Sequence, residues 1–169
     1  TGLYSFIVGV EYSLVDRTAK IDLGTSTLTT AGDVTIADST TGLNELAANG
    51  ATLNIAGNFA NSDKFTAGSS TVEFTKSSGT QTLNSGGTGT NYLFNNLTHS
   101  GAGTLQLLTN ALDVNGTFTN SAGTFNSNNL NMSLSVKNNI ILSGKTVAHL
   151  LYILSSLSIW RHAIIPKCP

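Results

Sequence analysis

The sequence predicts an all-β protein, and more narrowly a right-handed parallel β-helix, a solenoid in which each coil covers the next. Short segments of alternating apolar and polar residues recur from about residue 20 to 136, separated by Gly, Asn and Ser. The stretch "LNIAGNFANS" (53–62) also has a near-copy, "LDVNGTFTNS" (112–121). Charged residues make up only 10% of the chain. Thr, Ser and Asn take their place, and Thr favours strands.

The first segment, residues 1–20, carries a long alternation at every second position. These residues are Tyr4, Phe6, Val8, Val10, Tyr12 and Leu14. The period predicts a β-strand with one apolar face. Such a strand either packs on the body of the protein as a cap or pairs with a neighbouring subunit by strand addition.

The second segment, residues 21–136, holds the repeats. The matching positions of the two copies are Leu53, Ile55, Gly57 and Phe59 in one and Leu112, Val114, Gly116 and Phe118 in the other. A weaker copy with Leu28, Gly32 and Val34 lies 25 positions before the first, which is close to one coil. The offset of 59 between the two strong copies fits two longer coils or one supersecondary unit.

Within the repeat, each residue type suggests a place in the coil. Leu53 and Ile55 are two positions apart and are expected to point inward. Gly57 is expected at a corner that needs a positive φ. Asn61 and Asn120 follow the two copies and are expected to occupy left-handed corners or to stack as an amide ladder.

The third segment, residues 137–169, is expected to add a strand and then an apolar cap or tail. Its apolar residues Val147, Leu150, Leu151, Leu154 and Leu157 have helical spacing, which predicts a helix that caps the open end of the solenoid. A membrane span competes with this prediction, but it needs about 20 mostly apolar residues. The run is interrupted by His149, Ser155, Ser156, Ser158 and Arg161. A tail that forms a strand in assembly is the third alternative.

Charge and cysteine content exclude several classes of partner. The net charge is −1, and the eight Lys and Arg are scattered, so we expect no nucleic-acid binding. The single Cys168 cannot form an internal disulfide, and no Cys/His set has metal-ligand spacing. The composition is typical of secreted and surface proteins. No leader is visible before "TGLYSFIVGV", which suggests that one is removed or lies outside this sequence.

The residue types that carry catalysis form no recognisable set. "SGKT" (143–146) lacks the glycine that a phosphate loop needs five positions before Gly144, where Asn139 stands. The acidic residues are mostly isolated, although Asp33 and Asp38 could share one loop. His99, His149 and His162 have no triad partners in sequence. We therefore predict no catalytic, cofactor-binding or metal site, and no enzyme activity.

Two weaker patterns involve surface Thr and Asn. Thr-x-Thr pairs, which form ice-binding faces when they are aligned, occur at Thr25/Thr27, Thr80/Thr82, Thr88/Thr90 and Thr117/Thr119, but their spacing is irregular. Three Asn-x-Ser/Thr sequons mark candidate glycosylation sites at Asn96, Asn115 and Asn131. Strand propensity on an exposed face explains the Thr pairs equally well, and some sequons are expected by chance in a chain so rich in Asn, Ser and Thr.

The repeats resemble those of bacterial surface proteins of the filamentous-haemagglutinin-like or adhesin-like class. The resemblance rests on "LNIAGNFANSDKFTAGSSTVEFTKSSGTQTL" and "YLFNNLTHSGAGTLQLLTNALDVNGTFTNSAGTF". It implies a right-handed parallel β-helix that acts as an extracellular scaffold in adhesion, surface layers or filaments. We accordingly expect an extracellular or cell-surface module that self-associates and meets a glycan or cell-surface ligand. The alternatives are a carbohydrate-binding or carbohydrate-cleaving β-helix, and an antiparallel β-sandwich subunit of a pilus-like fibre.

Overall fold

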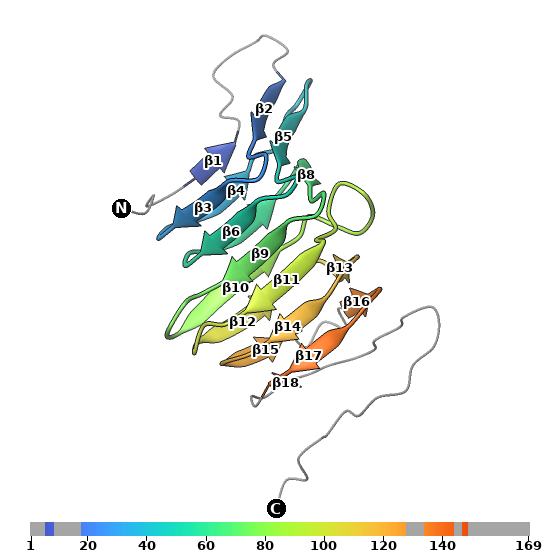
Figure 1. Ribbon diagram of the computed structural model, residues 1–169. Helices are drawn as coiled ribbons and strands as arrows, with labels where there is room; N and C mark the ends of the chain where they lie inside the picture. The colour runs from blue at the N-terminus through green and yellow to red at the C-terminus, as the bar shows by residue number, and fades with distance from the viewer. Residues whose placement is uncertain (1–5, 9–17, 128–133, 144–146, 149–169) are drawn as a thin grey trace, which may run out of the picture.

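The computed structural model describes residues 6–8, 18–127, 134–143 and 147–148, with side chains for 18–127 and 134–143. This part of the chain is all-β and contains no helix. Its strands stack as a parallel β-solenoid of about five turns along one axis (Figure 1). All strand pairs are parallel, as the solenoid prediction requires, and the antiparallel β-sandwich alternative is therefore wrong.

The coils form three faces, and most coils contribute one strand to each face. The six-stranded sheet contains β3 (Thr27–Thr30), β6 (Thr52–Ile55), β9 (Thr71–Phe74), β11 (Asn96–His99), β14 (Phe118–Asn120) and β17 (Ile140–Leu142). The seven-stranded sheet contains β1 (Phe6–Val8), β4 (Val34–Ile36), β7 (Phe59–Asn61), β10 (Thr80–Asn84), β12 (Thr104–Leu107), β15 (Thr124–Asn126) and β18 (Val147–Ala148).

The third face is made of two smaller sheets. One holds β2 (Ala19–Asp22), β5 (Asn44–Ala47) and β8 (Lys64–Thr66), and the other holds β13 (Leu112–Val114) and β16 (Leu134–Val136). Residues 91–94 fill the level between them. The Phe65 N–H donates to the Asn91 carbonyl, and Phe94 forms a parallel bridge with Val114. Backbone contacts therefore run along the whole third face, although residues 91–94 do not form a regular strand between the two small sheets.

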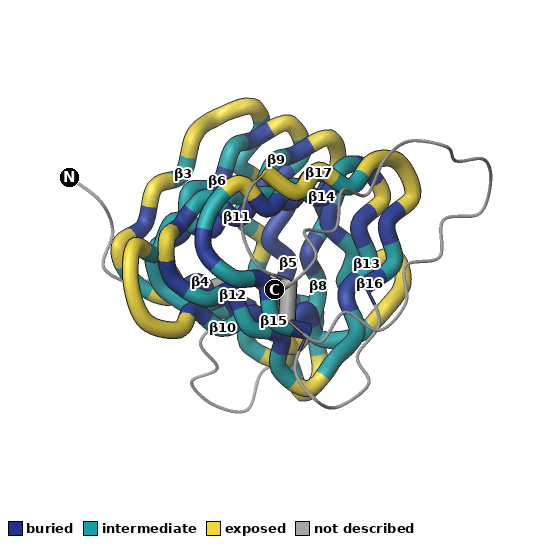
Figure 2. The backbone as a smooth tube through the Cα atoms, turned by 90° about the horizontal axis from the view of Figure 1, so that it is seen from below, coloured by how far each residue is buried: buried dark blue, intermediate teal, exposed yellow. Residues whose placement is uncertain are grey.

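The alternation in the sequence places apolar side chains inside every coil. Strands such as β6, β9 and β12 alternate between half-buried and buried positions, as the colours of the backbone in Figure 2 show. Successive side chains of a strand point to opposite faces, so the buried residues point into the coil. Inward residues stack in columns from coil to coil, as in Leu28, Leu53 and Val72. Because each coil covers the apolar face of the next, the core is one continuous column.

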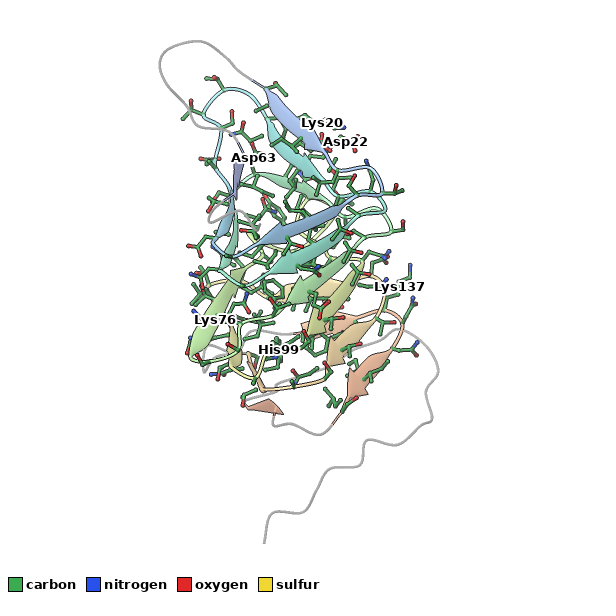
Figure 3. All side chains as sticks on the ribbon, turned by 60° about the vertical axis from the view of Figure 1, so that its left-hand side comes forward. Lys20, Asp22, Asp63, Lys76, His99 and Lys137 are labelled. Carbon is green, nitrogen blue, oxygen red and sulfur yellow. The ribbon has the colours of Figure 1, made fainter. Side chains whose placement is uncertain are left out.

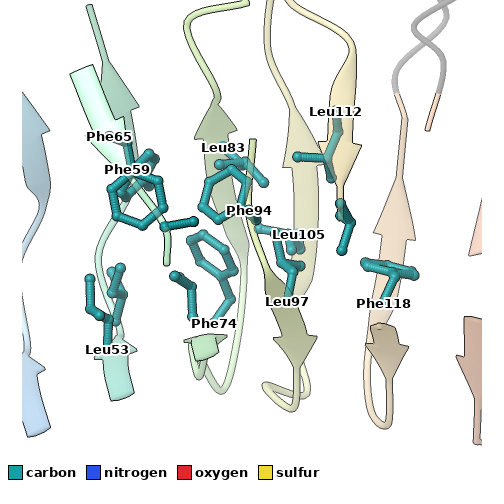
Figure 4. Packing of buried hydrophobic residues seen from close by; sticks show 14 of the residues in the cluster. Leu53, Phe59, Phe65, Phe74, Leu83, Phe94, Leu97, Leu105, Leu112 and Phe118 are labelled. Carbon is teal, nitrogen blue, oxygen red and sulfur yellow. The ribbon is translucent and has the colours of Figure 1, made fainter. Parts of the chain in front are cut away.

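Phenylalanine rings fill the centre of this core. Phe59, Phe65 and Phe94 contact one another, and the Phe94 ring centroid is 5.4 Å from that of Phe59 and 5.3 Å from that of Phe65 (Figure 4). Phe118 and Phe125 form a second pair with centroids 4.8 Å apart. Fully burying one such ring contributes about 1.5 to 3 kcal/mol. The rings of Phe59, Phe65 and Phe94 therefore join adjacent coils, whereas Phe118 on β14 and Phe125 on β15 pack against each other within one coil.

The two ends of the chain are only partly described. Phe6 and Val8 lie in β1, which pairs with β4 of the same chain, while Tyr4, Val10, Tyr12 and Leu14 lie outside the described residues. Val147, the first residue of the expected capping helix, lies in β18. The other four apolar residues of that pattern lie outside the described residues. The capping helix thus stays a prediction.

Candidate functional surfaces

The outer face of the six-stranded sheet carries two columns of aligned polar side chains. One column runs through Thr27, Thr52, Thr71 and Asn96, and the other through Thr29, Asn54, Glu73, Thr98 and Thr119. Neighbours in a column are about 4.8 Å apart, which is the spacing of hydrogen-bonded strands. We call this array the threonine face. Its side chains carry uncharged hydroxyl and amide groups, with the exception of the Glu73 carboxylate. That carboxylate accepts a hydrogen bond from the Ser100 hydroxyl.

The threonine face differs from the pattern that the sequence suggested. Of the Thr-x-Thr pairs, Thr117/Thr119 belongs to β14 and its entry, whereas Thr80/Thr82 lies in β10 on the seven-stranded sheet. The aligned columns instead join Thr residues of different coils, namely Thr27, Thr52 and Thr71 on the six-stranded sheet and Thr80, Thr104 and Thr124 on the seven-stranded sheet. The column through Thr27, Thr52 and Thr71 has no fixed period in the sequence, because the step from Thr27 to Thr52 differs from the step from Thr52 to Thr71.

Corner residues connect successive coils through side-chain hydrogen bonds. The Asp33 carboxylate accepts from the Asn58 N–H at 2.7 Å, and the Asn58 side-chain oxygen accepts from the Thr82 N–H at 2.9 Å. The buried Gln81 amide donates to the Ile55 carbonyl at 2.8 Å and also to the Gly57 carbonyl. These bonds satisfy backbone groups of the adjacent coil at and beside the corners, so these side chains contribute to stability as well as to turning.

An ion-pair cluster lies on the third face, where Lys20, which Figure 3 labels, is in register with Glu45 and Lys64 on β2, β5 and β8. The Glu45 carboxylate is 3.1 Å from the Lys64 ammonium and 3.5 Å from that of Lys20. The hydrogen bond from the Thr66 hydroxyl, at 2.6 Å, is the main cause that lowers the pKa of Glu45, and the two lysines add to it. Burial opposes this shift. The two ion pairs of Glu45 thus connect neighbouring strands of three successive coils.

A second buried polar pair joins β11 to β14. The His99 Nδ1 and the Asn120 Oδ1 are 2.7 Å apart, and both side chains are fully buried. Burial lowers the pKa of His99, and the hydrogen bond to Asn120 only partly opposes that effect. The two residues lie in register on adjacent coils, a pairing that nothing in the sequence indicates.

The strong repeat copies have the same local structure but lie on different faces. Leu53 and Ile55 belong to β6 and Phe59 to β7, whereas Leu112 and Val114 belong to β13 and Phe118 to β14. All six apolar residues are buried, as expected. The offset of 59 is therefore not two coils. The repeated unit is a strand, a corner and a strand, and the weaker copy at Leu28, Gly32 and Val34 is the one in register with the first.

The corner assignments within the repeat need correction. Neither Gly57 nor Gly116 is among the glycines with positive φ. A Cβ on Gly57 would overlap the Gly32 carbonyl of the coil above, so close approach is the reason for glycine there. Asn61 and Asn120 are buried at strand ends in different sheets, with neither a left-handed conformation nor a shared amide ladder. Asn61 donates to the Asn91 carbonyl, and Asn120 pairs with His99.

The remaining candidate residues are dispersed. Asp33 and Asp38 are exposed on either side of β4, so they do not share one loop. Among the described residues there is no group of three or more His, Cys, Asp or Glu that could hold a metal ion. Of the sequons, Asn115 is exposed at a corner, Asn96 accepts a bond from the Thr117 N–H, and Asn131 lies outside the described residues. His149, His162 and residues 144–146 of "SGKT" also lie outside them.

The last described strand of the six-stranded sheet, β17, presents an open edge. It pairs with β14 on one side and with no other described strand. Ile141 and Leu142 are 47% and 46% exposed, and in the described part of the chain they are the exposed large hydrophobic residues. An apolar edge with unpaired backbone groups is a template for another strand.

Comparison with models of protein families, with curated proteins and with solved structures found no match to this chain. No helix in the described ranges is long and apolar enough to cross a lipid bilayer.

Proposed function

We propose that this chain is an extracellular structural or adhesive module that self-associates into a homo-oligomer or filament through the β17 edge. The observation that carries the proposal is the combination of an open parallel edge with the exposed side chains of Ile141 and Leu142. Exposed apolar residues at a sheet edge favour the addition of a further strand, because backbone hydrogen bonds and burial are gained together.

A mechanical role agrees with the way in which the coils are joined. The parallel ladders, the phenylalanine core, the corner bonds and the Glu45 ion pairs all connect neighbouring coils along the same axis. Such a stack resists bending because every coil is held on both sides by its neighbours. The formal net charge of −1 produces little repulsion between copies.

Self-association can be tested by light scattering at several concentrations together with negative-stain electron microscopy. We expect the molar mass of the native chain to rise with concentration and Ile141→Lys to abolish the rise. Thr119→Lys is the matched control, because Thr119 is the register partner of Ile141 on the neighbouring strand but lies away from the edge. A native chain that stays monomeric throughout, or equal behaviour of the two variants, would contradict the proposal.

The threonine face favours a second role, the binding of a neutral carbohydrate. Its aligned hydroxyl and amide groups offer donors and acceptors at a regular spacing, with Glu73 as the one charge among the named positions. Binding to insoluble polysaccharides should weaken in Thr98→Val and persist in Thr88→Val, since Thr98 lies in β11 on the threonine face whereas Thr88 is exposed and lies in no strand. Equal binding of both variants would count against this face. Release of reducing ends from a bound polysaccharide would instead favour the cleaving alternative.

A further inference from the structure

His99 is enclosed by three neighbouring parts of the solenoid. Its side chain is fully buried and lies in register between Phe74 on β9 and Asn120 on β14. The corner of the next coil closes the remaining side, since a Cβ on Gly123 would lie 2.9 Å from the His99 Cε1 atom. The imidazole therefore has no path to solvent while these coils stay together.

The hydrogen bond of His99 decides which nitrogen holds the proton. An amide oxygen can only accept, so Nδ1 donates to the Asn120 Oδ1 at 2.7 Å. This leaves Nε2 as a buried acceptor without a partner, and the Asn120 Nδ2 is likewise buried without one. A second proton on the ring would create a charged N–H with no acceptor, which is strongly unfavourable in a buried position.

No described charge faces the ring to offset that cost. On β9, Glu73 pairs with Thr98 and so lies on the outer side of the sheet, and the Lys76 ammonium beyond β9 donates to the Thr80 carbonyl. The strands β10, β12, β14 and β15 carry no titratable side chain. Burial is accordingly the main cause that lowers the pKa of His99, and no charged group contributes.

We propose that the His99–Asn120 pair is an acid-sensitive latch, whose protonation releases β14 and β17 from β11. The bond holds the six-stranded sheet near its end, because in that sheet β17 is the one described strand beyond β14. The released segment is short, whereas β9, β6 and β3 continue the sheet on the other side. Opening at β14 therefore disturbs fewer contacts than opening at β9.

The direction of the pH effect follows from the lowered pKa. Above the ordinary histidine value of 6.5 the ring is neutral in both the closed and the open state. As the pH falls below 6.5, the open state binds a proton that the closed state does not, so the latch weakens. The weakening ends below the lowered pKa of the closed state and amounts to about tenfold in the opening constant for each unit of pKa difference.

The test is hydrogen exchange of the full chain, corrected for intrinsic rates, at about pH 7.5 and about pH 5, a range in which histidine titrates. We expect opening at β14 and β17 to increase at the lower pH while β6 stays protected. His99→Gln keeps an amide donor for Asn120 but cannot titrate, so it should lose the pH effect. His149→Gln and His162→Gln, which replace the other histidines, are the matched controls and should retain it.

Acid-induced opening that persists in His99→Gln, or that is equal at β6 and β14, would overturn the proposal. If His99→Gln does not fold, the proposal can still be tested by NMR titration of the His99 ring in the native chain. We expect the ring to charge below its ordinary value of 6.5 and only together with loss of protection at β14. A ring that titrates at that ordinary value while β14 stays protected would also overturn it.

Discussion

At the scale of single residues, Gly57 shows how closely two coils approach. Its corner stacks on that of Gly32, and an added Cβ would overlap backbone atoms of Gly32 and Asp33. Backbone atoms cannot rotate away as a side chain can, so Gly57→Ala must push the coils apart. We expect a loss of about 3 kcal/mol or more in the free energy of unfolding, measured by urea denaturation.

The control for Gly57→Ala is a glycine that is required for a different reason. Gly79 has a φ of +69°, but nothing lies within 4 Å of the position of its Cβ. Gly79→Ala should therefore cost only the strain of a left-handed residue, about 1 kcal/mol. Equal losses for the two variants would show that the close approach of the Gly32 and Gly57 corners is not what requires glycine.

At the scale of elements, the third face depends on a segment that is not a regular strand. Phe94 bridges to Val114 and places its ring against Phe59 and Phe65. Phe94→Ala removes the ring that links the two small sheets and should lower the free energy of unfolding by about 3 to 5 kcal/mol. Phe94→Leu keeps much of the volume and should cost less than about 1.5 kcal/mol, and both losses are measurable by urea denaturation. Similar losses would mean that the ring packing is not what joins the sheets.

The strands were predictable from sequence because their cause is local. Alternation predicts which residues of "LNIAGNF" and "LDVNGTF" are buried, and the structure confirms it. Their faces were not predictable, since a strand, a glycine corner and a strand follow the same local rules at each corner of the coil. Only pairing with neighbouring coils distinguishes β6 from β13, and this information is not contained in either stretch.

The candidate surfaces were harder to predict because coil lengths vary. The threonine column needs the steps from Thr27 to Thr52 and from Thr52 to Thr71, which differ in length. His99 and Asn120 are 21 positions apart, a spacing that matches neither step. A single fixed period therefore cannot place these residues in register, although each of them lies in a segment that the alternation marks as a strand.

At the scale of the whole molecule, the solenoid should tolerate the loss of one complete coil. Thr52 and Thr71 are register partners, so deleting residues 52–70 joins Ala51 to Thr71 and removes β6, β7 and β8 together. The new neighbours keep the alternation, with Val72 placed under Leu28 where Leu53 was. We expect the shortened chain to keep a β-type circular dichroism spectrum and cooperative unfolding at lower stability, because fewer coil interfaces remain.

The decisive comparison is a deletion that differs by one residue. Removing residues 52–69 leaves Ser70 at the position of Thr52, and this shift turns Thr71 inward and Val72 outward. If stacking of inward columns is what specifies the fold, this chain should be much less stable than the chain without 52–70, although it retains more of the sequence. Equal urea midpoints for the two deletions would mean that the corner absorbs the extra residue as a bulge. The register of each coil would then be determined by contacts within its own strands, and the columns would be a consequence of the fold and not its cause.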